Sequence, residues 1–234
     1  MKEDITMEST EKKERLPFSE WLDNVWYRYK WMILAGAVLA VFLVIALIQL
    51  FSARDADVKV LYIGPAYLTV EDSGRFKESM EKLAPDYDGD GHITTDVLDI
   101  TLNRVYDSSD PMHYVIVDQN NEANTRFQTE VRVGDAVLYI LDRTFFDECV
   151  KLGLLAPLDA VLGKGNVPEN ALDGYGIIIG NIDAQYLPGF DKIQKDMVLC
   201  LRRSPDEDEI KYNRSKDFWE NNRQTFINIV NYKR

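Results

Sequence analysis

The chain has 234 residues, 46% of them hydrophobic, which is enough apolar material for one packed domain with appendages. Its formal net charge is −12, from 39 acidic side chains against 27 lysines and arginines. A nucleic acid is therefore disfavoured as a partner, because proteins hold phosphate backbones with basic surfaces.

The first long element is an uncharged run of twenty residues, 32–51, with the sequence MILAGAVLAVFLVIALIQLF. As a helix it would be about 30 Å long, which matches the hydrocarbon thickness of a bilayer. A buried helix of a soluble protein would need a polar side. A cleaved signal peptide has a shorter apolar core followed by small residues, whereas this run ends on Phe51. The sequence therefore predicts a transmembrane helix that is retained.

Basic residues flank this run unequally, with five in residues 12–31 and two in residues 52–71. The positive-inside rule then places the N-terminus in the cytoplasm. We expect a single-pass protein of the cell membrane with a cytoplasmic tail at residues 1–31, a linker at 52–56 and an extracytoplasmic domain at 57–234.

The tail ends on an aromatic segment, LPFSEWLDNVWYRYKW at residues 16–31, whose apolar side chains recur at helical spacing. Tryptophan and tyrosine favour the headgroup layer, so we expect a short interfacial helix that leads into the span. It serves either as a membrane anchor or as a docking helix for a partner protein.

The external part alternates apolar runs with amphipathic segments. Strands are expected at residues 57–64, 92–103, 135–142, 175–180 and 196–203, and helices at 70–84, 120–134, 143–155 and 215–232. This alternation predicts a three-layer α/β domain with a mainly parallel sheet and helices on both sides.

Several residues are predicted to define helix ends. Asp72 or Ser73 would cap the helix at 70–84, and Asp142 with Thr144 would cap the helix at 143–155. Gly153 would end that helix in a left-handed conformation. On the last helix, one face should collect Phe218, Asn222, Thr225, Phe226 and Ile229.

The two cysteines, Cys149 and Cys200, lie in a helix-like and a strand-like stretch of the external part. The compartment permits a disulfide. Two cysteines in separate core elements are more often buried thiols, which is the interpretation that we favour.

An acidic stretch, DYDGDGHI at residues 86–93, has the spacing of an EF-hand calcium loop. Its ligands would be the side chains of Asp86, Asp88, Asp90 and Thr94 with the carbonyl of His92, and calcium is the candidate cofactor. The twelfth position is Val97, which lacks the two oxygens of the usual glutamate. The alternative is a solvated Asp-Gly turn between a helix and a strand.

Residues 127–162, FQTEVRVGDAVLYILDRTFFDECVKLGLLAPLDAVL, resemble a segment of the extracellular solute-binding proteins of ABC importers. That segment runs helix, Gly-Asp, apolar strand and helix, then a Gly-Leu-Leu-x-Pro-Leu-Asp turn. The resemblance implies one lobe of the type 2 periplasmic-binding-protein fold, reduced and membrane-anchored, as in single-span membrane proteins of clostridial-type Gram-positive bacteria. Such proteins usually have two lobes and are lipid-anchored or free, so we expect this chain to have kept the fold and lost the transport role.

In that family the ligand cleft lies past the carboxyl ends of the strands, as in open α/β sheets generally. The expected contact residues are Asp118, Gln119, Asn120, Asp142, Arg143 and Phe145. We expect no enzyme, because His92 and His113 are the only histidines and no catalytic motif is present.

The predicted function is non-catalytic binding of a small solute, a peptide or an envelope protein. The alternative is a scaffold or accessory subunit of a transporter-like membrane complex, with no ligand in the cleft.

Overall fold

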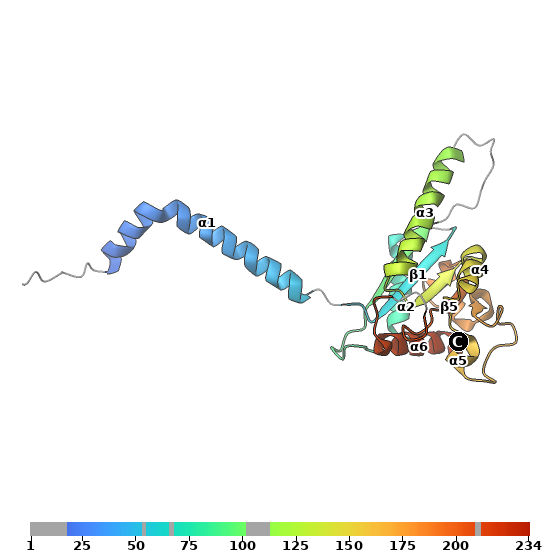
Figure 1. Cartoon of the computed structure of the whole chain (residues 1–234). Coiled ribbons are helices and arrows are strands. Elements are labelled where there is room, and N and C mark those ends of the chain that lie inside the picture. Colours follow the sequence, from blue (N-terminus) through green and yellow to red (C-terminus); the bar gives the residue numbers. More distant parts are fainter. Residues whose placement is uncertain (1–17, 53–54, 66–67, 102–112, 209–211) are drawn as a thin grey trace, which may run out of the picture. The chain divides into compact units, whose positions relative to one another are not determined.

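A computed structural model describes residues 18–52, 55–65, 68–101, 113–208 and 212–234; for residues 18–25, 48–52 and 113–119 it describes the backbone alone. The chain divides into two compact units, Met1–Asp55 and Ala56–Arg234 (Figure 1). Residues 1–17 of the predicted tail and 53–54 of the predicted linker lie outside the described residues.

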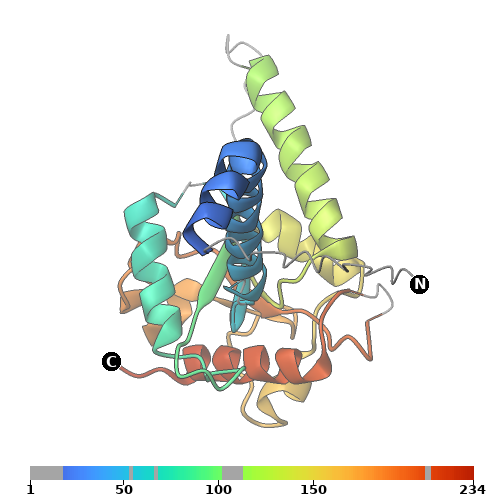
Figure 2. The same cartoon turned by 90° about the vertical axis from the view of Figure 1, so that its left-hand side faces the viewer.

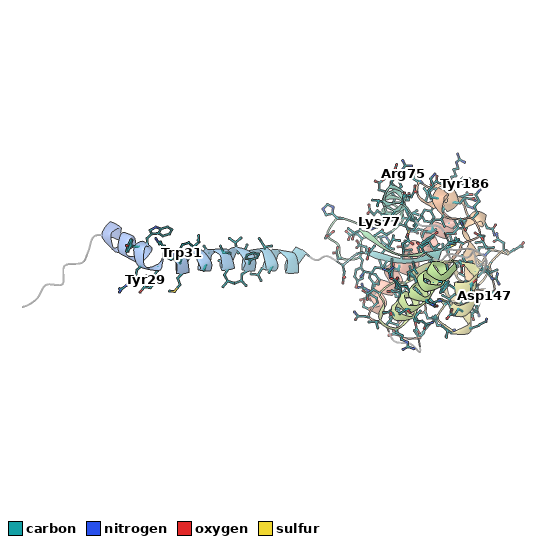
Figure 3. All side chains as sticks on the ribbon, turned by 90° about the horizontal axis from the view of Figure 1, so that it is seen from above. Tyr29, Trp31, Arg75, Lys77, Asp147 and Tyr186 are labelled. Atoms are coloured by element: carbon teal, nitrogen blue, oxygen red, sulfur yellow. The ribbon has the colours of Figure 1, made fainter. Side chains whose placement is uncertain are left out.

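The first unit contains one long helix, α1 (Phe18–Ser52). Within it, Trp26–Leu47 is long and apolar enough to cross a membrane. All described side chains of this stretch are exposed, including Trp31 at 75% and Phe42 at 66%, and Figure 3 shows Tyr29 and Trp31 projecting from the helix. The predicted interfacial segment and span form one continuous helix, whose apolar surface suits hydrocarbon rather than water.

The second unit is built on one five-stranded mixed sheet in the order β2-β1-β3-β5-β4. The strands are β1 (Val58–Gly64), β2 (Thr95–Thr101), β3 (Leu138–Leu141), β4 (Gly176–Ile178) and β5 (Val198–Leu201). β1 is parallel to β2 and β3, whereas β5 is antiparallel to β3 and β4. All five expected segments form strands, and the sheet is mixed because β5 runs opposite to the other four strands, which share one direction.

The antiparallel part has a local cause between β4 and β5. There the chain makes three short 3₁₀ turns, η1 (Ile179–Asn181), η2 (Asp183–Tyr186) and η3 (Phe190–Lys192). A parallel return needs a long crossover, usually a helix. Here the connection contains no α-helix, and β5 pairs with β4 antiparallel.

Side chains of each central strand alternate between two hydrophobic cores. In β1, Val60 and Tyr62 enter one core, while Leu61 and Ile63 enter the other. Helices α2 and α6 with the short α5 complete the first core, and α3 with α4 completes the second. α2 and α3 lie on opposite sides of the sheet in Figure 2, so the domain has three layers. The bounds are α2 (Val70–Glu81), α3 (His113–Val133), α4 (Arg143–Lys151), α5 (Leu158–Leu162) and α6 (Lys216–Asn231).

The helix ends follow local sequence, with one difference from expectation. The cap of α2 is Thr69, whose Oγ1 accepts a hydrogen bond from the amide of Asp72 at 3.1 Å. Asp142 caps α4 as predicted, and Gly153 after this helix has φ of 68°. The predicted face of α6 is confirmed, because all five of its residues are buried.

Candidate functional site

The carboxyl ends of β1 and β3 form the topological switch point of the sheet. α2 follows β1 on one face, and α4 follows β3 on the other. In open α/β sheets ligands bind at such a point, so the predicted contact residues have to be located against this edge.

Three of the predicted contact residues do not follow a strand. Asp118, Gln119 and Asn120 lie inside α3, which begins at His113 and not near Asn120 as expected. The side chains of Asp118 and Gln119 lie outside the described residues, and Asn120 is 2% exposed. The residues before Asn120 therefore form the first turns of α3 and not the end of a strand.

The other three predicted contact residues do lie at the switch point. Asp142 is fully buried, and its Oδ1 accepts a hydrogen bond from the amide of Phe145 at 3.0 Å. Phe145 is 3% exposed, and its ring lies 4.8 Å from that of Phe127. Both side chains therefore stabilise the fold.

Arg143 is the one member of this set whose described side chain is half-exposed, at 51%. Its Nε donates to Asp147 at 2.8 Å and its Nη2 to Asp173 at 3.1 Å. The guanidinium is thus held by two carboxylates at the edge where a ligand would approach.

Sequence reasoning missed Asp99, which lies near the same edge opposite Tyr62 of β1. Its Oδ2 accepts a hydrogen bond from the amide of Leu68 at 3.2 Å. Burial raises the pKa of this carboxyl group, and the bond from Leu68 opposes the shift. An acidic residue inside an apolar strand was the signal in the sequence.

The acidic loop connects α2 to β2, as predicted, but it gathers a different set of carboxylates. Among the described residues, oxygens of Asp57, Asp86 and Asp88 lie within 4.8 Å of one another. The carboxylate of Asp90 instead accepts a hydrogen bond from the amide of His92 at 2.7 Å. Asp57 was overlooked because it was assigned to the start of a strand.

Asp57 ties both ends of this loop to the start of β1. The residue is 3% exposed, and its Oδ1 accepts a hydrogen bond from the amide of Tyr87 at 2.8 Å. Its Oδ2 accepts from the amide of Thr94 at 2.7 Å and from the hydroxyl of Thr94 at 3.2 Å. The predicted ligand Thr94 is therefore bonded to a carboxylate.

Asp86 is held by the loop's own amides. It accepts hydrogen bonds from Gly89 at 2.8 Å and from Gly91 at 2.9 Å. These bonds, chiefly the one from Gly91, lower the pKa of Asp86. Backbone donors thus compensate part of the carboxylate repulsion, as in a solvated Asp turn, and calcium binding stays a prediction.

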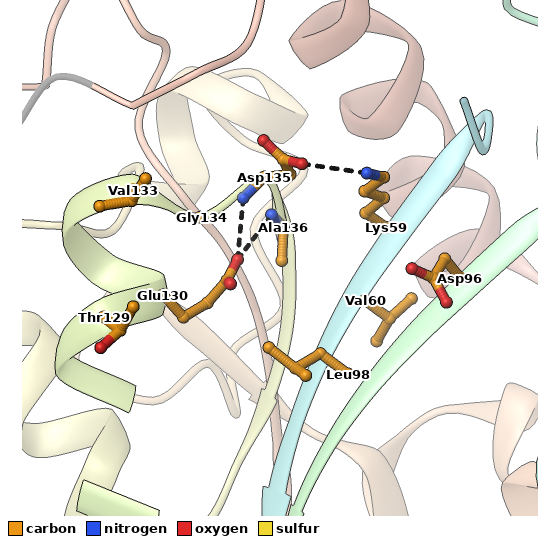
Figure 4. Close-up of a pocket in the computed structure, with 10 residues that line it drawn as sticks. All are labelled: Lys59, Val60, Asp96, Leu98, Thr129, Glu130, Val133, Gly134, Asp135 and Ala136. Carbon is orange, nitrogen blue, oxygen red and sulfur yellow. Dashed lines mark hydrogen bonds and ion pairs between the residues drawn. The ribbon is translucent and has the colours of Figure 1, made fainter. Parts of the chain in front are cut away.

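A cavity of about 350 Å³ opens at the opposite edge, near the amino ends of β1 and β2 (Figure 4). Val60 and Leu98 supply apolar surface, and α3 contributes its last turns. The Nζ of Lys59 lies 3.0 Å from Oδ2 of Asp135, which also accepts from Nη2 of Arg214 at 2.9 Å. Sequence reasoning did not identify this site.

Glu130 is fixed at the wall of this cavity by the turn after α3. Its Oε1 accepts hydrogen bonds from the amides of Asp135 and Ala136, each at 2.9 Å. A Cβ at Gly134 would collide with the carboxylate of Glu130, so glycine permits this arrangement. The second oxygen, Oε2, makes no hydrogen bond with any described residue.

The two cysteines are free and buried. Burial raises the pKa of Cys149 to about 12 and that of Cys200 well above its ordinary value. Thiols that stay protonated at neutral pH are poor nucleophiles, so neither cysteine suits covalent catalysis.

Comparisons of the chain with protein-family models, with curated proteins and with solved structures found no match.

Proposed function

We propose that this chain is a single-span membrane protein whose residues 57–234 form a non-catalytic, extracytoplasmic binding domain. The observation that carries the proposal is the exposed apolar surface of Trp26–Leu47 in a chain whose second unit has its own hydrophobic cores. A bilayer accommodates that surface, and the unit then works tethered to the membrane. The excess of basic residues before the span supports an N-terminus in the cytoplasm.

The domain is further proposed to be a reduced relative of one lobe of the extracellular solute-binding proteins. The sequence of residues 127–162 supports this origin, together with the three-layer α/β architecture. The bound molecule would be a small solute, a peptide or an envelope protein. Mixed apolar and charged cavities, such as the one beside Glu130, are typical of binding sites.

A scaffold subunit of a transporter-like complex is the second candidate. Helix α1 has 35 residues and is thus about 52 Å long, whereas the hydrocarbon layer is about 30 Å thick. Its aromatic first turns therefore extend beyond the span, where they are available to a membrane or cytoplasmic partner.

Capture from native membranes separates these two candidates. The baits are the full chain, residues 1–55 with the span, and residues 56–234 as a soluble domain. Binding of an envelope protein predicts a stoichiometric component with the first and third baits, and binding of a small solute predicts a melt shift of the third bait with that solute. Retention of the same integral membrane component by residues 1–55 alone would contradict the proposal and support the scaffold.

A further inference from the structure

We propose that the cavity at the amino ends of β1 and β2 binds an organic cation, namely an ammonium or guanidinium group on an apolar stem. This inference rests on the proposed binding function and specifies the ligand chemistry. Of the residues lining the cavity, the charged ones are Lys59, Asp96, Glu130 and Asp135, which is three carboxylates against one ammonium.

The positive charges near the cavity are already directed at one carboxylate. Lys59 and Arg214 both bind Oδ2 of Asp135, at 3.0 Å and 2.9 Å. The carboxylates of Asp96 and Glu130 make no ion pair with any described residue, although Asp96 lies opposite Lys59 in the register of β1 and β2.

These two carboxylates face the cavity from different elements. Asp96 comes from β2 and is exposed, and it makes no hydrogen bond or ion pair with any described residue. Glu130 comes from α3, and its Oε1 is held by two backbone amides, so that Oε2 remains for a ligand. Figure 4 shows Asp96 and Glu130 on opposite sides of Leu98.

The geometry of Glu130 is built into the fold rather than accidental to one rotamer. Its carboxylate is bonded to the amides of Asp135 and Ala136, and Gly134 leaves the space that it needs. In the proposed complex a guanidinium or ammonium group bridges the two carboxylates, and its stem covers Val60 and Leu98, which line the cavity. The volume of about 350 Å³ lies within the range of ligand pockets.

A cation of this kind is either a free amine or guanidine, or a lysine or arginine side chain of a peptide. The probes are therefore butylguanidinium, N-acetylarginine amide and its uncharged isostere N-acetylcitrulline amide. Binding is measured by saturation-transfer-difference NMR on the full chain in nanodiscs of zwitterionic lipid, with empty nanodiscs as the blank.

We expect saturable binding of both guanidinium probes, weakened by salt because charges carry it. Asp96→Asn and Glu130→Gln should each weaken it about two- to five-fold, the range for a partly exposed ion pair. The citrulline probe should bind about 4- to 25-fold more weakly, because it loses both pairs. Tighter binding of N-acetylarginine amide than of butylguanidinium assigns the site to a peptide side chain, and equal binding assigns it to a free cation.

Glu78→Gln is the matched control. Glu78 is exposed on α2, away from the cavity, and its replacement changes the net charge as much as Asp96→Asn or Glu130→Gln does. Equal binding of the arginine and citrulline probes would overturn the inference, and so would the absence of saturable binding. It would also be overturned if Asp96→Asn, Glu130→Gln and Glu78→Gln changed the affinity for the guanidinium probes equally. The capture experiment uses none of these probes. A component captured by the domain while the probes fail would remove this site and leave the binding function in place.

Discussion

Replacing Asp208 by alanine should destabilise the domain more than any surface change, because it leaves a buried guanidinium without its facing carboxylate. Arg202 and Asp208 have side chains that are 0% and 1% exposed, and Nε lies 2.9 Å from Oδ2. Arg202 also donates to the carbonyl of Val131 at 2.8 Å and stacks on Tyr212 at 3.9 Å. These contacts hold the guanidinium in place after the carboxylate is removed.

Removing one partner of a buried ion pair costs about 3–5 kcal/mol, whereas the whole free energy of unfolding of a domain is about 5–15 kcal/mol. For a unit of this size that loss lowers the Tm by about 6–20 °C. Urea unfolding of residues 56–234 measures it through Trp219, the one tryptophan of this unit, whose Nε1 donates to the carbonyl of Arg202 at 2.6 Å. The fragment contains both hydrophobic cores in full.

The control is Asp206→Ala, two positions earlier in the chain. Asp206 pairs with Lys216 at 3.6 Å, and both side chains are more than 60% exposed. Such a pair contributes at most about 1 kcal/mol. If Asp208→Ala loses no more free energy of unfolding than this control, the carboxylate of Asp208 does not compensate the buried charge of Arg202.

Three further outcomes are expected from the same fragment. Asp142→Ala should lower the free energy of unfolding by about 0.5–2 kcal/mol, because it removes the N-cap of α4. Thr144→Ala, at an exposed position two residues later, should change it little, and urea unfolding measures both. Burial raises the pKa of Cys149 from 9.0 to about 12. The buried protonated thiol therefore contributes its full stabilisation below pH 9, and this stabilisation is lost as the pH rises towards 12. Thermal melts between pH 9 and 12 should show the Tm falling as the pH rises. If the acidic loop binds calcium, a few millimolar calcium should raise the Tm, and Asp86→Asn should abolish the rise while Asp90→Asn retains most of it, since Asp90 lies outside the carboxylate group. No rise with calcium would leave the loop as an acidic turn.

Apolar periodicity was sufficient to find all five strands, because each is a short run of apolar and β-branched residues and only β2 is mostly half-buried. It was not sufficient for strand direction. The direction of β5 depends on what connects it to β4, and three 3₁₀ turns carry no helical period that a sequence pattern would reveal.

The candidate site was predictable only in part. Asp142 was identified from its position between an apolar strand and a helix, and it does cap α4. Asp118, Gln119 and Asn120 were misplaced because the helix was expected to begin near Asn120, whereas α3 begins at His113. Asp57 lies near Asp86, 29 residues away, so its role arises from the tertiary fold. Glu130 binds an amide only 5 residues away, so its role arises from the local turn after α3, which no apolar pattern reveals.

The central claim is that the α/β domain lies outside the membrane with the N-terminus inside, and labelling of intact cells tests it most directly. The native cysteines are buried, so a cysteine introduced at the exposed Lys164 or in the tail at Ser9 can be labelled selectively. A membrane-impermeant maleimide should modify Lys164→Cys in intact cells and Ser9→Cys only after lysis. The reverse pattern, or equal labelling of both positions in intact cells, would contradict the account.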